Sequence, residues 1–166
     1  SQDQLRMIKR IVKSQNLDDN LYDPKALQSF INTQKDKGKR YNDANNDDDK
    51  YIEIYKEYDS ACRQTNSVDF ADLILLTYEM FNNNPIILKY YINRFQNIMV
   101  DEFQDTNTLQ FNLLKLINGK TGSLYAVGDD DQSIYGWRGA RSRNIQFFED
   151  EFNDVEIFKL EQNYRS

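Results

Sequence analysis

The feature that most constrains the fold is a pair of short apolar runs, each followed directly by a polar motif. Residues 97–100 (NIMV) precede residues 101–107 (DEFQDTN), and residues 123–127 (SLYAV) precede residues 128–140 (GDDDQSIYGWRGA). Short apolar runs bounded by polar turns are typical of buried strands. In an open α/β sheet, ligands bind at the carboxyl ends of the strands. The sequence therefore predicts two strands whose ends carry a ligand site.

The same alternation continues along the second half of the chain. Helical patterns at residues 109–117 and 142–152 separate the two predicted strands from a third at residues 156–160. Strands that alternate with helices favour a parallel, doubly wound sheet, so we predict an α/β fold here.

Residues 1–66 read as helical instead. Asp23 followed by proline is typical of a helix start, and Tyr51, Tyr55, Tyr58 and Cys62 form one stripe at helical spacing. The polar residues 35–49 predict a solvated loop, and a duplex contact by the basic residues 35–40 is the alternative. Asp69 is expected to cap a further helix, and residues 86–95 form the next. The expected buried stripe of the Asp69-capped helix contains Phe70, Leu73, Ile74, Thr77, Met80 and Phe81.

Composition excludes several kinds of site. The chain has no histidine, which removes His-based triads and zinc sites, and its one cysteine cannot form an internal disulfide. A lone cysteine fits a reducing cytoplasm, and no apolar run approaches the ~20 residues of a membrane span. With a net charge of −6, any DNA contact must be local or shared with segments outside this chain.

Residues 119–121 (GKT) imitate the end of a phosphate-binding P-loop. The loop needs a glycine at position 114, which is leucine here, and it needs a strand before it and a helix after it. Gly119 is better explained as a helix C-cap. We therefore expect the phosphate cradle to lie upstream in a longer protein, and the 166-residue chain by itself to lack ATPase activity.

Residues 101–107, 128–140 and 160–166 (LEQNYRS) resemble motifs II, III and IV of superfamily 1 DNA helicases of the UvrD/Rep/PcrA type. Residues 68–73 (VDFADL) resemble the short motif that precedes them. The resemblance implies part of a RecA-like parallel sheet, a P-loop NTPase fold that lacks its P-loop half. Residues 1–66 would be a helical 1B-like subdomain, and residues 67–166 the second half of domain 1A.

The resemblance also implies roles in ATP hydrolysis. Asp101 would hold Mg²⁺ and Glu102 would orient the attacking water, a division of labour that adjacent acids at a strand end can support. Gln132 would sense the γ-phosphate, Arg165 would stabilise the charge of the transition state, and Tyr164 would stack on adenine. The plainer alternatives are solvated acids, a turn residue and a capped strand end.

DNA contacts are implied for four residues. Trp137 and Tyr135 resemble aromatics of the single-strand track, and Arg138 beside them could connect that track with the ATP site. Phe70 belongs to the same set of contacts, although its place on an apolar stripe favours a core position. A lone tryptophan is also commonly a core residue, but glycines on both sides of residues 137–138 favour a surface turn.

The expected function is thus that of a fragment of an ATP-dependent 3′→5′ DNA helicase. It would act on single-stranded DNA and on junctions with duplex DNA, in repair or replication. Two alternatives remain open: a non-catalytic nucleic-acid interaction module, and a metal-dependent nuclease that uses Asp101, Glu102 and Asp129. Asp105 is ambiguous as well, because capping the helix near residue 107 explains it equally well.

Overall fold

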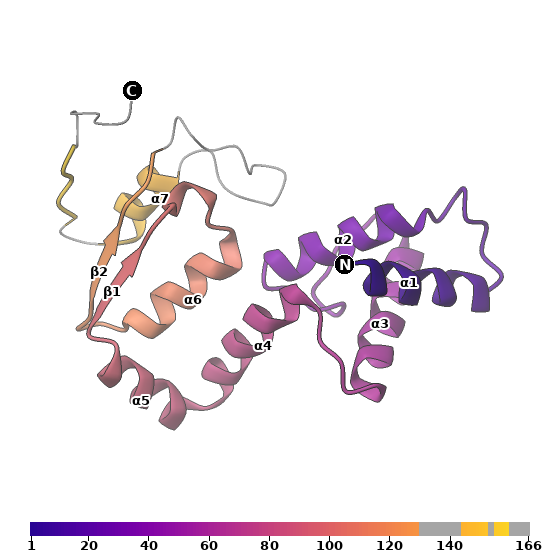
Figure 1. Cartoon of the computed structure of the whole chain (residues 1–166), viewed down its shortest axis with the longest axis horizontal. Coiled ribbons are helices and arrows are strands. Elements are labelled where there is room, and N and C mark those ends of the chain that lie inside the picture. Colours follow the sequence, from indigo (N-terminus) through magenta and orange to yellow (C-terminus); the bar gives the residue numbers. More distant parts are fainter. Residues whose placement is uncertain (130–143, 153–154, 160–166) are drawn as a thin grey trace.

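The structure, a computed structural model, describes residues 1–129, 144–152 and 155–159. Figure 1 shows the helices α1, α2 and α3 at one end of the molecule and the strands β1 and β2 at the other, with α4 lying between them. In chain order the elements are α1 (Gln2–Ser14), α2 (Pro24–Asp36), α3 (Asp49–Gln64), α4 (Phe70–Asn83), α5 (Pro85–Arg94), β1 (Asn97–Val100), the 3-10 turn η1 (Phe103–Asp105), α6 (Thr108–Asn118), β2 (Ser123–Ala126) and α7 (Asn144–Glu151).

Side-chain caps fix where the helices begin. The Asp23 carboxylate accepts hydrogen bonds from two backbone N–H groups at the start of α2. Asp69 and Asp72 form a reciprocal capping box at the start of α4, so the expected caps at positions 23 and 69 are confirmed. Gly119 ends α6 with φ 62°, and a Cβ there would lie 3.0 Å from the side chain of Ile92.

The apolar core of the first part is built from α1, α2 and α3. The expected stripe on α3 is confirmed at Tyr55, Tyr58 and Cys62, which are buried, and Tyr51 packs against them half-buried. Fully burying a large apolar side chain stabilises the fold by about 1.5–3 kcal/mol, so this cluster is the main source of stability here. Its buried members are Ile8, Ile11, Val12, Leu27, Ile31, Ala44, Ile54, Tyr55, Tyr58 and Cys62.

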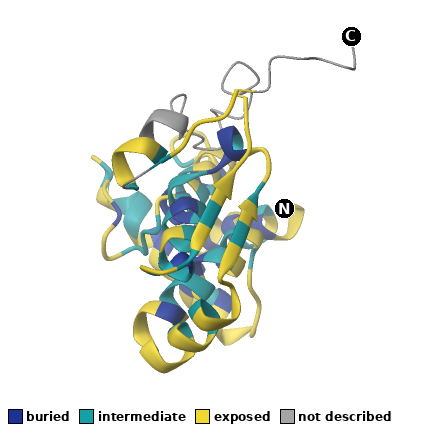
Figure 2. Cartoon of the chain, turned by 90° about the vertical axis from the view of Figure 1, so that its left-hand side faces the viewer, coloured by how far each residue is buried: buried dark blue, intermediate teal, exposed yellow. Residues whose placement is uncertain are grey.

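The two expected strands are present and parallel. Asn97 of β1 pairs with Ser123 of β2, and the register continues to Val100 and Ala126. Figure 2 shows the two strands side by side, with exposed and half-buried residues along both. The third expected strand is not present in residues 156–159, and its last residue, 160, lies outside the described residues. The first two residues of the helix expected at 142–152 also lie outside the described residues, and α7 begins at Asn144. The wider RecA-like sheet and the division at residue 66 stay predictions.

The buried face of α4 differs from the expected one. Asp72 and Leu75 are buried. Asp72 belongs to the capping box of α4 and also accepts a hydrogen bond from Lys35 of α2, so this side of the helix faces α2. This orientation rotates much of the expected apolar stripe outward, and the prediction that Phe70 lies in the core is wrong. Within the stripe, Phe81 is buried, Ile74 and Thr77 are half-buried, and Phe70, Leu73 and Met80 are exposed.

The predicted loop is present over residues 37–48, but its predicted start at residue 35 is wrong, because Lys35 lies in the last turn of α2 and is fully buried. Its Nζ donates to Asp69 Oδ2 and to Asp72 Oδ2, both at 2.7 Å. A lysine is almost never buried unless it is paired, and here two carboxylates of α4 compensate its charge. Burial acts to raise the pKa of Asp69, but the hydrogen bond and charge of Lys35, with further hydrogen bonds to the carboxylate, keep this pKa below its ordinary value.

Arg40 extends this network to α3 and to the far end of α4. Its Nη1 donates to Asp59 Oδ1 (2.8 Å) and to Asp72 Oδ1 (3.0 Å), and its Nε and Nη2 bind both oxygens of Glu79. Burial opposes the charge on Arg40, but its hydrogen bonds and ionic contacts with these acids raise its pKa above the ordinary value. We call Lys35, Arg40, Asp59, Asp69, Asp72 and Glu79 the ion-pair network; it ties α2, α3 and α4 together.

Candidate functional site

The carboxyl ends of β1 and β2 lie against each other. The backbone N–H of Val127 donates to the carbonyl of Val100 (2.8 Å), and the N–H of Phe103 donates to the carbonyl of Val127 (3.0 Å). These bonds extend the parallel pairing beyond the strands themselves. They bring Asp101 and Glu102 next to Gly128 and Asp129, so the structure joins the starts of the two polar motifs that the sequence singled out.

Asp101 and Glu102 are both exposed at this edge. Asp101 Oδ1 accepts a hydrogen bond from the backbone N–H of Glu102 (2.9 Å). Glu102 has φ 51° and ψ 42°, the left-handed conformation. Among the described residues, the other non-glycine residues with positive φ are Asn16 and Asn66, a residue type that tolerates this region. For glutamate it costs on the order of 1 kcal/mol, and such strain clusters at functional sites.

Gln104 is part of this edge, and the sequence reasoning missed it. It is only 2% exposed, and its Nε2 donates to Glu102 Oε2 at 2.6 Å. Its Oε1 accepts from the backbone N–H of Asp129 at 3.0 Å. The available signal in the sequence was an amide two residues after the second acid, together with a glycine that opens the second motif.

Asp105 does not cap α6, so that explanation of it is wrong. Asn107 is the N-cap, in a reciprocal capping box with Gln110. Asn107 Nδ2 also donates to Asp36 Oδ1 (3.0 Å), which links α6 to the end of α2. Asp105 Oδ1 is buried and has no hydrogen-bond partner among the described residues.

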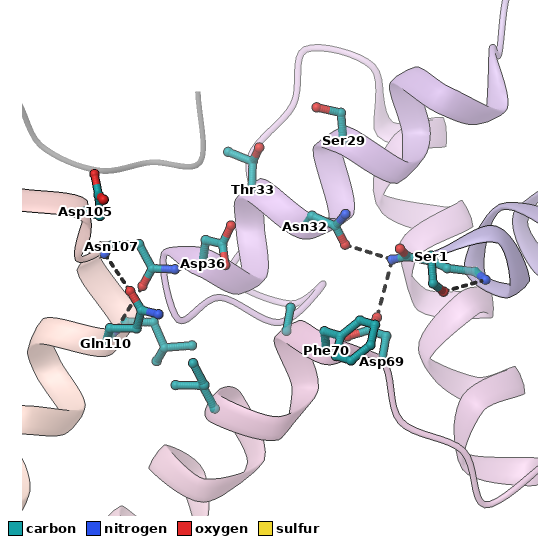
Figure 3. A pocket seen from close by; sticks show the side chains of 14 residues that line it. Ser1, Ser29, Asn32, Thr33, Asp36, Asp69, Phe70, Asp105, Asn107 and Gln110 are labelled. Atoms are coloured by element: carbon teal, nitrogen blue, oxygen red, sulfur yellow. Dashed lines mark hydrogen bonds between the residues drawn. The ribbon is translucent and has the colours of Figure 1, made fainter. Parts of the chain in front are cut away.

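A groove of about 690 Å³ runs between α2, the start of α4 and the η1–α6 turn (Figure 3). Phe70 stands in it with 79% of its surface exposed. Hydroxyl, amide and carboxyl groups make up much of the remaining wall. Gln4, another lining residue, donates from Nε2 to Asn32 Oδ1 (2.8 Å) and to Asp69 Oδ2 (3.3 Å). An exposed aromatic ring among polar groups suits stacking on a planar ligand.

Of the expected site residues, the structure thus places Asp101 and Glu102 at the strand ends and Phe70 in the groove. The other expected residues of the ATP site and the DNA track lie outside the described residues. These are Gln132, Tyr135, Trp137, Arg138, Tyr164 and Arg165.

Neither a metal-ligand cluster nor a membrane-spanning helix is present in the part of the chain that the structure describes. Over residues 1–129, 144–152 and 155–159, no three acidic, cysteine or histidine side chains gather as metal ligands. The three-carboxylate arrangement of the nuclease alternative is therefore not seen among them. No helix in the same residues has the length and apolar character needed to cross a bilayer.

The family profile and the similar proteins point to the same family. The profile described as the UvrD/REP helicase N-terminal domain matches residues 1–153. The chain is 49% identical to DNA helicase II of Haemophilus influenzae and 47% identical to that of Escherichia coli, with 100% of the chain aligned. It is 41% identical to the ATP-dependent DNA helicase PcrA of Staphylococcus epidermidis, over 99% of the chain. These alignments cover 23–24% of the relatives, so the chain spans about a quarter of their length.

Proposed function

Because this chain belongs to the UvrD/REP helicase N-terminal domain family, we propose that the full-length protein is an ATP-dependent DNA helicase. It moves 3′→5′ on single-stranded DNA and unwinds duplex DNA at junctions, in repair or replication. Residues 1–66 serve in it as a 1B-like subdomain, and residues 67–166 as the second half of a RecA-like domain 1A. The relatives' names and the strand-end site support this proposal.

The exposed acids at the end of β1 are the observation that carries the proposal. Mg²⁺ bound together with nucleotide phosphates needs only one or two protein carboxylates, and Asp101 and Glu102 offer them at an open edge. The ion supplies charge neutralisation on the phosphates. Asp101 would hold the ion, and Glu102 would orient the attacking water and accept its proton. Gln132 and Arg165 act on the γ-phosphate, and Tyr164 stacks on adenine.

Single-stranded DNA is proposed to contact Phe70 in the groove, together with Tyr135, Trp137 and Arg138. Stacking on aromatic rings tolerates any base sequence, as a translocating motor requires. The exposure of Phe70 supports this role, because a core residue would have no free ring face. The negative net charge is compatible with it, since stacking does not need a basic surface.

The test is Glu102→Gln in the full-length protein. The amide keeps the shape of the side chain but cannot accept a proton, so DNA-stimulated ATP turnover should fall by at least about 100-fold. The dissociation constants for ATP and single-stranded DNA should stay within about twofold. Steady-state ATPase assays and equilibrium binding measure the two quantities.

Glu57→Gln is the matched control, because Glu57 is exposed on α3, away from the strand ends. It should leave turnover unchanged. Retention of more than about a tenth of the turnover by Glu102→Gln would rule out Glu102 as the base. A full-length protein that binds DNA but never hydrolyses ATP would favour the non-catalytic module.

A further inference from the structure

A single buried amide connects the two polar motifs. Gln104 follows Glu102 by two residues, yet its side chain reaches both the Glu102 carboxylate (2.6 Å) and the backbone N–H of Asp129 (3.0 Å). One contact lies on the segment after β1 and the other on the segment after β2. Gln104 is thus a bridge between the two strand ends, made by a side chain with almost no exposure to solvent.

The chemistry of the bridge requires an amide. The Glu102 carboxylate can only accept a hydrogen bond and the Asp129 N–H can only donate one, so the residue between them must do both. Glutamine offers a donor and an acceptor on one rigid plane, whereas glutamate would lose the donor and methionine would lose both. The bond to a charged carboxylate is also of the stronger kind.

The backbone around the bridge is shaped to fit it. A Cβ at position 128 would lie 2.6 Å from Gln104 Oε1, closer than real contacts allow, so only glycine lets the amide approach the chain there. On the other side, the left-handed conformation of Glu102 directs its carboxylate to the same amide. Two costly local features, a glycine and a strained glutamate, therefore both serve the position of Gln104.

We propose that Gln104 is a positioning residue that fixes the Glu102 carboxylate against the backbone after β2. A displacement of residues 128–129 is then transmitted through the amide to Glu102, because hydrogen bonds weaken steeply when their geometry is lost. Residues 132–138, which the proposed function assigns to the γ-phosphate and to DNA, begin three positions after Asp129 in the sequence. This inference rests on the proposed role of Glu102 as the base.

The experiment compares Gln104→Met and Gln104→Glu in the full-length protein, with Gln64→Met and Gln64→Glu as controls at an exposed position of α3. Both Gln104 variants should lower kcat by about 10- to 100-fold, the range for a catalytic group misplaced by up to 1 Å. KM for ATP and the dissociation constant for single-stranded DNA should stay within about twofold. The Gln64 variants should match the wild type.

Hydrogen–deuterium exchange of the nucleotide-free protein separates the two halves of the bridge. Gln104→Met removes the acceptor for the Asp129 N–H, so peptides containing residues 128–129 should exchange faster. Gln104→Glu keeps an acceptor of the same length, so exchange there should stay close to that of the wild type while kcat falls. A purely structural role would change KM, DNA affinity and exchange together in both variants, and that result overturns the proposal.

A double-mutant cycle with Glu102→Gln distinguishes this inference from the proposed function. If Gln104 acts through Glu102, Gln104→Met should cost little further single-turnover rate once Glu102 is replaced, whereas additive losses overturn the inference. Loss of turnover in Glu102→Gln with a normal kcat in both Gln104 variants refutes the positioning role and leaves the proposed function intact. Turnover that survives Glu102→Gln refutes the base assignment, and the positioning role with it.

Discussion

The ion-pair network and the strand-end edge treat carboxylates in opposite ways. In the network, Asp59 and Asp72 are buried and the side chain of Asp69 is only 7% exposed, and each carboxylate lies within 3.0 Å of a lysine or arginine nitrogen. At the edge, Asp101 and Glu102 are exposed, and neither takes part in an ion pair among the described residues. Both regions are rich in carboxylates, and they differ in whether a positively charged side chain neutralises each one.

The difference separates structural charge from charge that is available for chemistry. A buried ion repays its desolvation only when partners surround it, so the network is committed to holding α2, α3 and α4 together. Asp101 and Glu102 instead accept hydrogen bonds from amide groups. Their negative charge is not compensated by an ion pair among the described residues, so it is available to hold a cation or to take a proton. The comparison therefore predicts large stability effects in the network, and functional effects at the edge and in the adjoining groove.

The largest expected effect on stability is that of Lys35→Met in the 166-residue chain. Methionine keeps the apolar stem of the side chain but leaves Asp69 without a cation and Asp72 with Arg40 alone. Removing one partner of a buried ion pair costs about 3–5 kcal/mol. Urea denaturation followed by far-UV circular dichroism measures this loss.

Lys37→Met is the matched control, because Lys37 lies two residues after Lys35, at the C-cap of α2, and is exposed. Its free energy of unfolding should change by less than about 0.5 kcal/mol. Glu102→Gln should also change the free energy of unfolding by less than about 0.5 kcal/mol. A loss in Glu102→Gln as large as that in Lys35→Met would abolish the distinction between the two regions.

How much was predictable depended on how local the cause was. The caps at Asp23 and Asp69 and the strands before residues 101 and 127 follow from neighbours in the chain, and the sequence predicted them. Lys35 read as solvated, because its carboxylate partners lie 34 and 37 residues away. Its burial required a tertiary contact that no local pattern reports, and the outward rotation of Phe70 followed from the same contact.

The candidate site divides along the same line. Asp101 and Glu102 were identified from their place after an apolar run, which is local information. Gln104 was missed because its second partner, the Asp129 N–H, is 25 residues away. The expected capping role of Asp105 failed because Asn107, two residues later, satisfies the capping box with Gln110. A choice between two nearby caps depends on backbone geometry that propensities do not resolve.

A smaller effect is expected from Phe70→Ala in the full-length protein. Loss of a stacking ring should weaken binding of a single-stranded oligonucleotide by about 1–3 kcal/mol. Fluorescence anisotropy with a labelled oligonucleotide measures the dissociation constant. The free energy of unfolding of the 166-residue chain should change by less than about 0.5 kcal/mol, because the ring is exposed.

Ile86→Ala is the control for apolar exposure, since Ile86 is 86% exposed on α5 and does not line the groove. It should leave DNA affinity unchanged. Equal binding losses in the Phe70 and Ile86 variants would mean that general surface hydrophobicity, and not the groove, accounts for the effect.

The smallest expected effect is confined to acid pH and concerns Asp69. Its carboxylate accepts from Lys35 Nζ (2.7 Å), the Tyr58 hydroxyl (2.8 Å) and Gln4 Nε2 (3.3 Å). Burial raises its pKa, but the hydrogen bond and charge of Lys35, together with hydrogen bonds from the Asp72 N–H and Tyr58, hold that pKa below the ordinary value. A carboxylate whose pKa is lower in the folded than in the unfolded chain stabilises the fold above the unfolded pKa of about 3.9, and this contribution disappears as the pH falls through the folded pKa.

Asp69→Asn keeps a good N-cap but does not titrate. The difference in unfolding free energy between wild type and Asp69→Asn should therefore be constant from about pH 7 to 5 and shrink below about pH 4. Urea titrations at a series of pH values measure this difference, and a difference that stays constant down to pH 3 would mean that the Lys35–Asp69 pair does not depend on the charge of Asp69.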